Sequence, residues 1–235
     1  MRSPVLTPLV PVRMSDPDRA TAHMAASVLL GYPGPAEVAS FPAVRAAVQS
    51  LPGAVRERFT DFLDAADAMA AADPESLAVH YVATFDLRRR CSMYLTYFVA
   101  GDTRNRGLAL VSFVQAYQAA GWAVDSDELP DYLPVVLEFS ARELAGDGAP
   151  VIAAGLLSTN RGGIEVLRSA LTGFGSLYAS LVEAVCLTLP PIDAETERRY
   201  LELVSSGPPS ELVGLQSFGP LEPFVPVGAQ TETRV

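Results

Sequence analysis

Apolar side chains recur at spacings of three and four residues along most of this 235-residue chain. No segment shows the sustained alternation of apolar and polar residues, broken by hairpin turns, that strands need. The first helix has clear boundaries, since Ser15 or Asp16 can cap it, Pro17 suits its first turn, and Gly31 ends it. This pattern predicts an all-α fold, a single-domain helical bundle.

The same signals place the other helices along the chain. Asp73, Pro74 and Glu75 form a fresh helix start, which puts His80 and Tyr81 on a helix. Glycines at 162–163 and 173–175 interrupt the apolar stretch 150–189, so we expect two or three helices there. The predicted helical ranges are 16–30, 55–70, 77–85, 108–120, 130–144, the stretch 150–189, and a last helix capped by Asp193 that runs through Val204.

Proline-rich ends flank this helical region. Residues 1–15 contain three prolines and lack the continuous apolar run of a secretory signal, so they predict a flexible N-terminal tail. We expect the helical domain to occupy residues 16–206. Prolines at 208, 209, 220, 223 and 226 replace helical periodicity in residues 207–235, which indicates an extended or disordered tail. The longest uncharged stretch, 107–124, carries polar side chains and predicts no membrane insertion.

Charge narrows the classes of partner. The formal net charge is −10, and all 17 basic residues are arginines. An acidic protein lacks the broad basic surface that displaces counterions from phosphates, so we expect no nucleic-acid partner. Only Cys91 and Cys186 are present, which does not make a disulfide framework. This cysteine usage is typical of a reducing, cytoplasmic location.

The inventory of catalytic and metal-binding residues is small. His23 and His80, the two histidines, lie on separate predicted helices without metal-ligand spacing, so we expect structural roles for both, no metal and no cofactor. Cys91 follows three arginines, which favour its thiolate. However, no motif ties a general base to Cys91, and a small, buried residue is the favoured interpretation. Cys186 is expected in the core.

The segment His80–Gly107 combines arginine with aromatic residues, and we call it the arginine–aromatic block. It holds five of the 17 arginines between Asp86 and Arg106, for a local balance of +3. Aromatic and arginine side chains are enriched in the parts of interfaces that contribute most binding energy. The alternative is structural, because aromatics at helical spacing also fill cores and arginines also brace helices. The residues alone leave both interpretations open.

Several motifs give this chain a family resemblance. The most specific are the elements Tyr-Leu-Thr-Tyr and Gly-Asp-Thr-Arg, in this order. The segments that carry the resemblance are Leu29–Pro33, Tyr81–Asp86, Cys91–Tyr97, Gly101–Gly107, Glu128–Phe139 and, more weakly, Pro220–Pro226. With these segments the sequence resembles the nitrate reductase delta-subunit family, the NarJ-type molybdenum cofactor assembly chaperones, across nearly its whole length.

This resemblance implies an all-helical, cytoplasmic chaperone without catalytic activity. Such proteins bind the N-terminal peptide of the apo catalytic (alpha) subunit of respiratory nitrate reductase and assist molybdenum cofactor insertion. A small helical enzyme using Cys91 and a helical adaptor unrelated to molybdenum remain alternatives, and a monomer or a homodimer is compatible with the sequence. The partner-binding residues that we expect are Tyr94, Tyr97, Asp102, Arg104, Arg106, Asp131, Leu133, Glu138 and Phe139.

Overall fold

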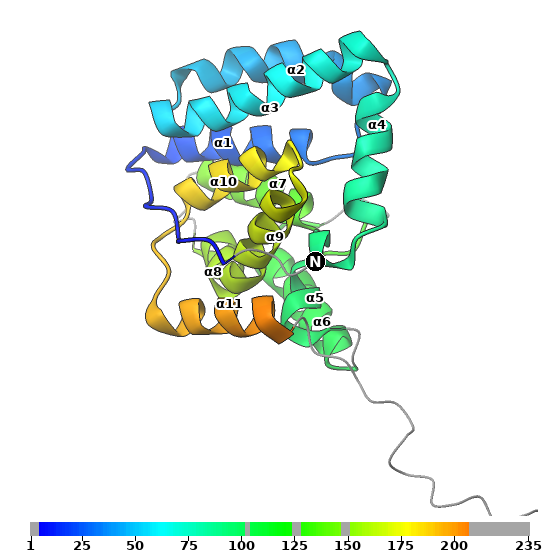
Figure 1. Cartoon of the computed structure of the whole chain (residues 1–235). Coiled ribbons are helices and arrows are strands. Elements are labelled where there is room, and N and C mark those ends of the chain that lie inside the picture. The colour runs from blue at the N-terminus through cyan, green and yellow to red at the C-terminus, as the bar shows by residue number, and fades with distance from the viewer. Residues whose placement is uncertain (1–4, 102–103, 124–127, 147–150, 207–235) are drawn as a thin grey trace, which may run out of the picture.

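All regular structure in the described residues is helical (Figure 1). This computed structural model describes residues 5–101, 104–123, 128–146 and 151–206. Its α-helices are α1 (Asp16–Leu29), α2 (Pro35–Ala47), α3 (Gly53–Ala72), α4 (Ser76–Tyr81), α5 (Leu95–Ala100), α6 (Asn105–Ala119), α7 (Leu133–Leu144), α8 (Ile152–Thr159), α9 (Arg161–Phe174), α10 (Tyr178–Thr188) and α11 (Ala194–Ser206). The three short helical turns are η1 (Val48–Ser50), η2 (Val82–Asp86) and η3 (Arg89–Cys91). The predicted all-α fold is confirmed.

The helices pack around a core between α1, α3, α7, α9 and α10. Helix α1 lies along α7, α10 contacts both α3 and α9, and α11 packs on α9. In Figure 1, α2 and α3 form the upper layer and α11 closes the lower end. Phe59 and Phe62 of α3 and Tyr178 of α10 are among the largest fully buried side chains. None of the described helices combines the length and apolar character needed to cross a bilayer.

Local capping explains where the first and last helices start. The Ser15 hydroxyl accepts a hydrogen bond from the amide of Asp18 at 3.2 Å, and proline occupies the first turn of α1. Asp193 does the same for α11, accepting from the amide of Thr196 at 2.7 Å. Both predicted helix starts are confirmed.

Three helices, α8, α9 and α10, occupy the described part of the stretch 150–189, in agreement with the predicted two or three. The first break lies at Asn160, between α8 and α9, rather than at residues 162–163. Gly162 and Gly163 lie within the first turn of α9, which continues to Phe174. A Cβ atom at Gly163 would lie 2.9 Å from Cδ2 of Phe98, so a glycine here lets α5 approach α9 closely. The break predicted farther along is confirmed, because α9 ends at Gly175 with a left-handed φ of 72°.

Residues 5–15 lie against the helices without forming a helix or strand, which differs from the flexible tail expected for residues 1–15. Three hydrogen bonds hold the segment: Leu6 N to the Tyr200 hydroxyl (2.8 Å), Arg168 Nη2 to the Thr7 carbonyl (3.0 Å), and Val12 N to the Leu187 carbonyl (2.8 Å). Residues 1–4 and the expected C-terminal tail, 207–235, lie outside the described residues.

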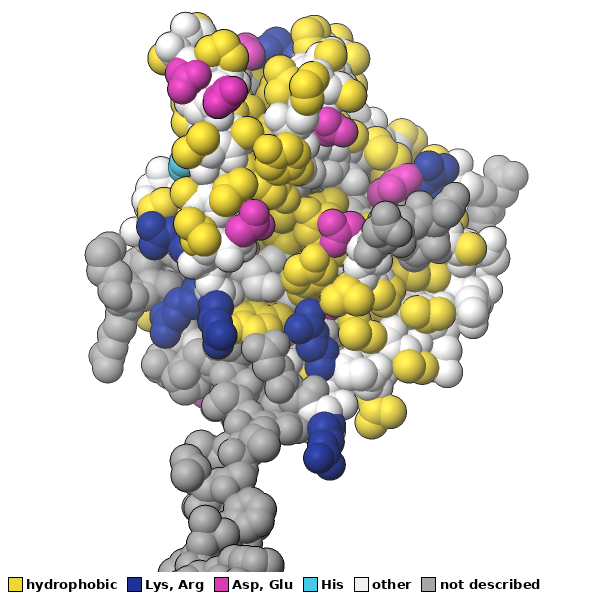
Figure 2. All heavy atoms as spheres, turned by 90° about the vertical axis from the view of Figure 1, so that its right-hand side faces the viewer, with side chains coloured by type: hydrophobic (Ala, Val, Ile, Leu, Met, Phe, Trp, Pro, Cys, Tyr) yellow, Lys and Arg dark blue, Asp and Glu magenta, His cyan; other side chains and the backbone are white. Residues whose placement is uncertain are grey.

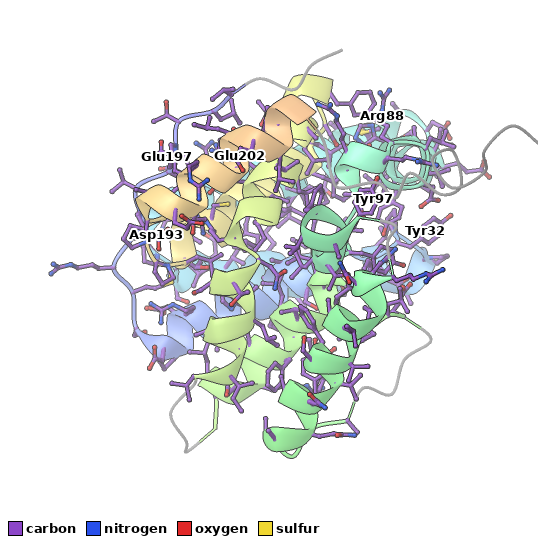
Figure 3. All side chains as sticks on the ribbon, turned by 90° about the horizontal axis from the view of Figure 1, so that it is seen from below. Tyr32, Arg88, Tyr97, Asp193, Glu197 and Glu202 are labelled. Atoms are coloured by element: carbon purple, nitrogen blue, oxygen red, sulfur yellow. The ribbon has the colours of Figure 1, made fainter. Side chains whose placement is uncertain are left out.

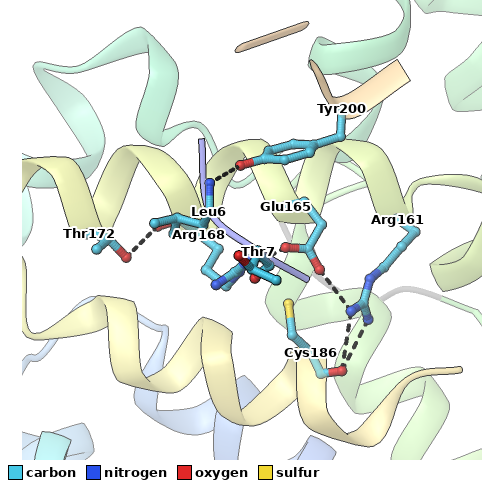
Figure 4. Close-up of polar contacts among 8 residues, drawn as sticks. All are labelled: Leu6, Thr7, Arg161, Glu165, Arg168, Thr172, Cys186 and Tyr200. Carbon is cyan, nitrogen blue, oxygen red and sulfur yellow. Dashed lines mark hydrogen bonds and ion pairs between the residues drawn. The ribbon is translucent and has the colours of Figure 1, made fainter. Parts of the chain in front are cut away.

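Arg168, which donates to the Thr7 carbonyl, belongs to a buried ion network on α9 (Figure 4). Glu165 is fully buried and lies 2.8 Å from Arg161 Nη2 and 2.7 Å from Arg168 Nε. The two arginines are only 4% and 3% exposed. Arg161 also donates to the Cys186 carbonyl, and Arg168 reaches the N-terminal segment. The network therefore joins α9, α10 and residues 5–15.

Candidate functional site

A pocket of about 580 Å³ opens on the side of the molecule that holds α4 and α5. Figure 2 turns this side to the viewer, with apolar side chains between acidic side chains above and arginines below. We call it the tyrosine pocket, because most of its aromatic lining is tyrosine. The aromatic residues are Tyr32, Tyr81, Phe85, Tyr94, Tyr97 and Tyr132, and the charged ones are Asp86, Arg89, Arg106 and Glu128.

A π-helical turn brings the first half of the arginine–aromatic block to this pocket. After α4 the backbone continues as η2, a single turn of π-helix, and such turns are often found at functional sites. Tyr81 and Phe85 then stand with ring centroids 4.8 Å apart. Tyr32, from the loop after α1, meets Tyr81 edge to face at 5.4 Å and is 53% exposed. Three chain segments thus form one aromatic wall with an accessible edge.

The opposite wall comes from the starts of α5 and α7. Tyr94 and Tyr132 directly precede these helices, and their backbones pair in an isolated antiparallel β-bridge. Their ring centroids lie 5.3 Å apart. The Tyr132 hydroxyl lies 3.0 Å from that of Tyr81, which links the two walls. The Tyr94 hydroxyl donates to Glu128 Oε2 at 2.9 Å. In Figure 3, Tyr32 and Tyr97 lie on the same side of the molecule, away from the acidic residues labelled on α11.

Burial sets the protonation state of these phenols. It raises the pKa of Tyr81 to about 12, and it raises the pKa values of Tyr94 and Tyr132 further. For Tyr94 the hydrogen bond to Glu128 adds to the rise, because a nearby carboxylate disfavours a phenolate. The phenols are therefore neutral at physiological pH. Tyr94 uses its hydrogen on Glu128, whereas one hydroxyl of the Tyr81–Tyr132 pair can donate its hydrogen to a bound group.

Asp131 holds the second wall in place from inside the protein. Its carboxylate is fully buried and accepts from the amide and hydroxyl of Thr96, at 2.9 and 2.6 Å. The Asp131 carbonyl accepts from the amide of Leu95 at 3.0 Å. A carboxylate at this place accepts from an amide in the first turn of α5 that has no partner within the helix, and its negative charge interacts favourably with the helix dipole. Asp131 thus fixes the helix that carries Tyr97.

We expect Asp131→Ala to lower the free energy of unfolding by about 2–3 kcal/mol, because a buried amide and hydroxyl lose a charged acceptor. Urea unfolding, followed by circular dichroism, measures this loss. Asp131→Asn is the matched control, since its amide oxygen can still accept from Thr96, and it should lose about 1 kcal/mol. An alanine variant as stable as the wild type would contradict the capping role.

The arginines of the block divide into two groups. Arg88 stacks on Phe174 at 3.5 Å from the ring centroid, and Arg90 donates to the Val204 carbonyl at 3.4 Å. These two brace helices, as the structural interpretation of the block predicted. Arg89 and Arg106 line the tyrosine pocket, and Arg106 lies 5.7 Å from the Tyr94 ring centroid. The block therefore serves both purposes, scaffold and pocket.

The structure brings three of the nine expected binding residues to the pocket, Tyr94, Tyr97 and Arg106. Asp131 lies directly behind them. Leu133 and Phe139 are buried in the core, Glu138 forms a surface ion pair with Arg142 at 2.7 Å, and Arg104 is exposed at the start of α6. Asp102 lies outside the described residues. Contact of any of them with a partner stays a prediction.

Among the pocket residues that were not expected to bind a partner, Tyr32, Glu128 and Tyr132 lie outside the arginine–aromatic block. All three lie inside segments that carry the family resemblance, Leu29–Pro33 and Glu128–Phe139. Membership of these segments is the sequence signal that points to the three residues, whereas the fold buries Asp131, Leu133 and Phe139, which were expected from the second segment.

Cys91 is placed as a core residue. It is 2% exposed, and burial raises the pKa of its thiol to about 11, with Arg88 offsetting only part of the effect. A protonated, enclosed thiol disfavours the alternative in which Cys91 is a nucleophile. His80 bonds the Ser176 hydroxyl at 2.8 Å and stacks on Tyr178. Within the described ranges, no group of three or more His, Cys, Asp or Glu side chains could hold a metal ion.

Known proteins resemble this chain over most of the region that forms the pocket. Residues 48–181 match the nitrate reductase delta subunit family. A Bacillus subtilis protein named probable nitrate reductase molybdenum cofactor assembly chaperone NarJ is 34% identical over 181 residues. That alignment covers 76% of this chain and 94% of the relative.

Two further relatives match shorter stretches. The Escherichia coli K12 nitrate reductase molybdenum cofactor assembly chaperone NarJ is 36% identical over 88 residues, 34% of this chain and 37% of the relative. The Mycobacterium tuberculosis H37Rv nitrate reductase-like protein NarX is 48% identical over 117 residues. This match covers 50% of the present chain but only 17% of NarX, so the chain spans a small part of that relative's length.

Proposed function

This chain belongs to the nitrate reductase delta-subunit family, and we propose that it is a system-specific chaperone for a respiratory nitrate reductase. It binds the apo catalytic subunit and assists molybdenum cofactor insertion and enzyme assembly, without catalysing a reaction itself. The relatives named as assembly chaperones support this role. The protein works in the cytoplasm as a monomer or homodimer, and its two free, buried cysteines suit a reducing compartment.

The tyrosine pocket is the observation that carries this proposal. Its lining comes from five of the segments on which the resemblance rests, Leu29–Pro33, Tyr81–Asp86, Cys91–Tyr97, Gly101–Gly107 and Glu128–Phe139. They belong to three separate parts of the chain, 29–33, 81–107 and 128–139, and packing alone does not require that their aromatic rings share one accessible surface. We assign this surface to the N-terminal peptide of the catalytic subunit.

The pocket's chemistry suits an amphipathic peptide. Six aromatic rings offer an apolar surface for its hydrophobic side chains, and one hydroxyl of the Tyr81–Tyr132 pair can donate to its polar groups. At the rim, Asp86 and Glu128 would meet basic residues, while Arg89 and Arg106 would meet acidic ones, so the charges set the register. The net charge of −10 favours a peptide that is basic overall.

The other expected residues take supporting roles in this proposal. Asp131 positions α5, and Leu133 and Phe139 fix the start of α7 against the core. Arg104 and Glu138 are surface residues, and we assign them to contacts with the body of the catalytic subunit rather than with its peptide. Asp102, which lies outside the described residues, stays an expected contact.

Calorimetric titration of the full chain with a synthetic peptide from the catalytic subunit's N-terminus tests this function. We expect saturable binding, and Tyr97→Ala should raise the Kd about tenfold or more, as truncated aromatic anchors do. Leu201→Ala is the control, because this half-exposed side chain lies on α11, outside the pocket. Circular dichroism checks that both variants fold.

Two outcomes would count against the proposal. If the peptide gives no binding heat even at high concentration, the N-terminal peptide of the catalytic subunit is not the ligand of this protein. Equal weakening by Tyr97→Ala and Leu201→Ala would place the binding surface elsewhere on the protein. The stoichiometry of the same titration, combined with sedimentation, distinguishes a monomer from a homodimer.

A further inference from the structure

The sequence after α11 contains prolines at a regular interval. Pro220, Pro223 and Pro226 follow one another at three-residue steps in the run Gly219–Pro226. A polyproline II helix has three residues per turn, so these three prolines would share one edge of it. Such a helix also leaves its backbone carbonyls free to accept hydrogen bonds. The spacing is therefore typical of a ligand that binds in the polyproline II conformation.

The tyrosine pocket has the chemistry that binds such a ligand. Proline-rich segments in this conformation dock onto grooves lined by aromatic side chains. The pocket offers six aromatic rings, and within the Tyr81–Tyr132 pair the hydroxyl whose hydrogen is not used between the two can donate to a carbonyl of the segment. Tyr32, at 53% exposure, gives an accessible ring against which a proline can pack.

The connection between the two is short. Helix α11 ends at Ser206, and the carbonyl of Val204 in its last turn accepts from Arg90. Arg90 directly follows Arg89, which lines the pocket. The 13 residues that separate Ser206 from Pro220 can span up to roughly 45 Å when extended. The run Gly219–Pro226 is therefore tethered within reach of the pocket.

One charge of the segment has counterparts at the pocket. Glu222 lies between the first two prolines of the repeat. Arg89 and Arg106, which line the pocket, can meet its carboxylate.

We propose that Gly219–Pro226 binds the tyrosine pocket of its own chain as a polyproline II segment and competes there with the partner peptide. The docking follows from the pocket and the proline repeat alone, whereas the competition rests on the proposed function. A tethered segment acts at an effective concentration on the order of 1 mM. If it fills about nine pockets in ten, the partner's apparent Kd rises about tenfold.

Photo-crosslinking in the full chain tests the docking. We expect Phe224→p-benzoylphenylalanine to crosslink within one chain to peptides that contain Tyr94, Tyr97 or Tyr132. The combined substitution P220A/P223A/P226A should abolish these products while it leaves residues 5–206 unchanged in sequence. The control is the same photoreactive group at Val213, outside the proline repeat, which should not give the pocket products.

Peptide titration of P220A/P223A/P226A then separates the two proposals. A Kd for the catalytic-subunit peptide about tenfold below that of the wild type supports the competition. Crosslinks outside the pocket, or products of twice the chain's mass from a second copy, would overturn the intramolecular docking, even if the partner peptide binds normally. Pocket crosslinks without any binding of the partner peptide would support the docking and remove the proposed function instead.

Discussion

Glu165→Gln is expected to lower the free energy of unfolding by about 3–5 kcal/mol, which is a large part of the stability of a domain of this size. Glutamine keeps the shape of the side chain but removes its charge. Arg161 and Arg168 would then remain cationic and almost fully buried, without the carboxylate that lies within 2.8 Å of both in the native protein. Desolvated charges without a counterion are among the costliest defects in a protein core.

Urea unfolding measures this loss, and the chain provides a matched control. Glu138→Gln makes the same chemical change in an ion pair with Arg142 that is four residues away on an exposed helix face. Such pairs contribute little, so the control should lose less than about 0.5 kcal/mol. If the two variants were equally stable, water or other groups must solvate the arginines of α9, and the network would not be a structural element.

The sequence pattern could not reveal this network. Arg161, Glu165 and Arg168 recur at spacings of four and three, which is also the pattern of a solvated, salt-bridged helix face. Their burial depends on α10, α11 and residues 5–15, all distant in the chain. The flexible tail expected for residues 1–15 has the same origin, because nothing local to that segment encodes its bonds to Arg168 and Tyr200.

Predictions that rest on local chemistry agreed best with the structure. The start of α1 at Ser15 and of α11 at Asp193 follows from side chains that bond amides three residues away. Helix α2, in contrast, was not predicted, because Pro42 lies inside it where proline normally breaks a helix. The prediction placed the first break of the stretch 150–189 at the two glycines of α9, because the role of Gly163, which makes room for the ring of Phe98, depends on a residue that is distant in the sequence.

The site shows the same limit. The family resemblance led to Tyr94, Tyr97 and Arg106, which do line the pocket. It could not separate exposed from buried members of the Glu128–Phe139 segment. Tyr132 lies on the pocket, whereas Leu133, its neighbour, points into the core, because consecutive residues at a helix start face different directions.

Acid is expected to weaken the protein through His23. This side chain is fully buried between α1, α7 and the end of α10, and its ring nitrogens lie 2.8 Å from the hydroxyls of Ser140 and Thr188. Thr188 donates its own hydrogen to the Val185 carbonyl, so we infer that it accepts from Nε2, and that Ser140 donates to Nδ1. The neutral ring is thus fully satisfied. Burial, with a smaller contribution from Arg19, lowers the pKa of His23 to about 3.

The sign of the pH effect follows from the two states. In the unfolded chain His23 has a pKa of 6.5, so between that value and about 3 the unfolded state binds a proton that the folded state does not. The stability that the neutral ring contributes is complete above this window and is lost as the pH falls through it. At about pH 4.5, two units below the unfolded pKa, the loss is about 2–3 kcal/mol.

His23→Gln separates this contribution from the carboxylates that titrate in the same range. Glutamine offers one acceptor and one donor to the two hydroxyls but takes up no proton. Urea unfolding of both proteins from about pH 7.5 to about pH 4.5 should show the wild type losing about 2–3 kcal/mol more than the variant. The carboxylates and His80, whose pKa burial also lowers, are common to both proteins and cancel in the comparison. Parallel stability curves would mean that His23 is protonated equally in the folded and unfolded states, which contradicts its burial between two neutral hydroxyls.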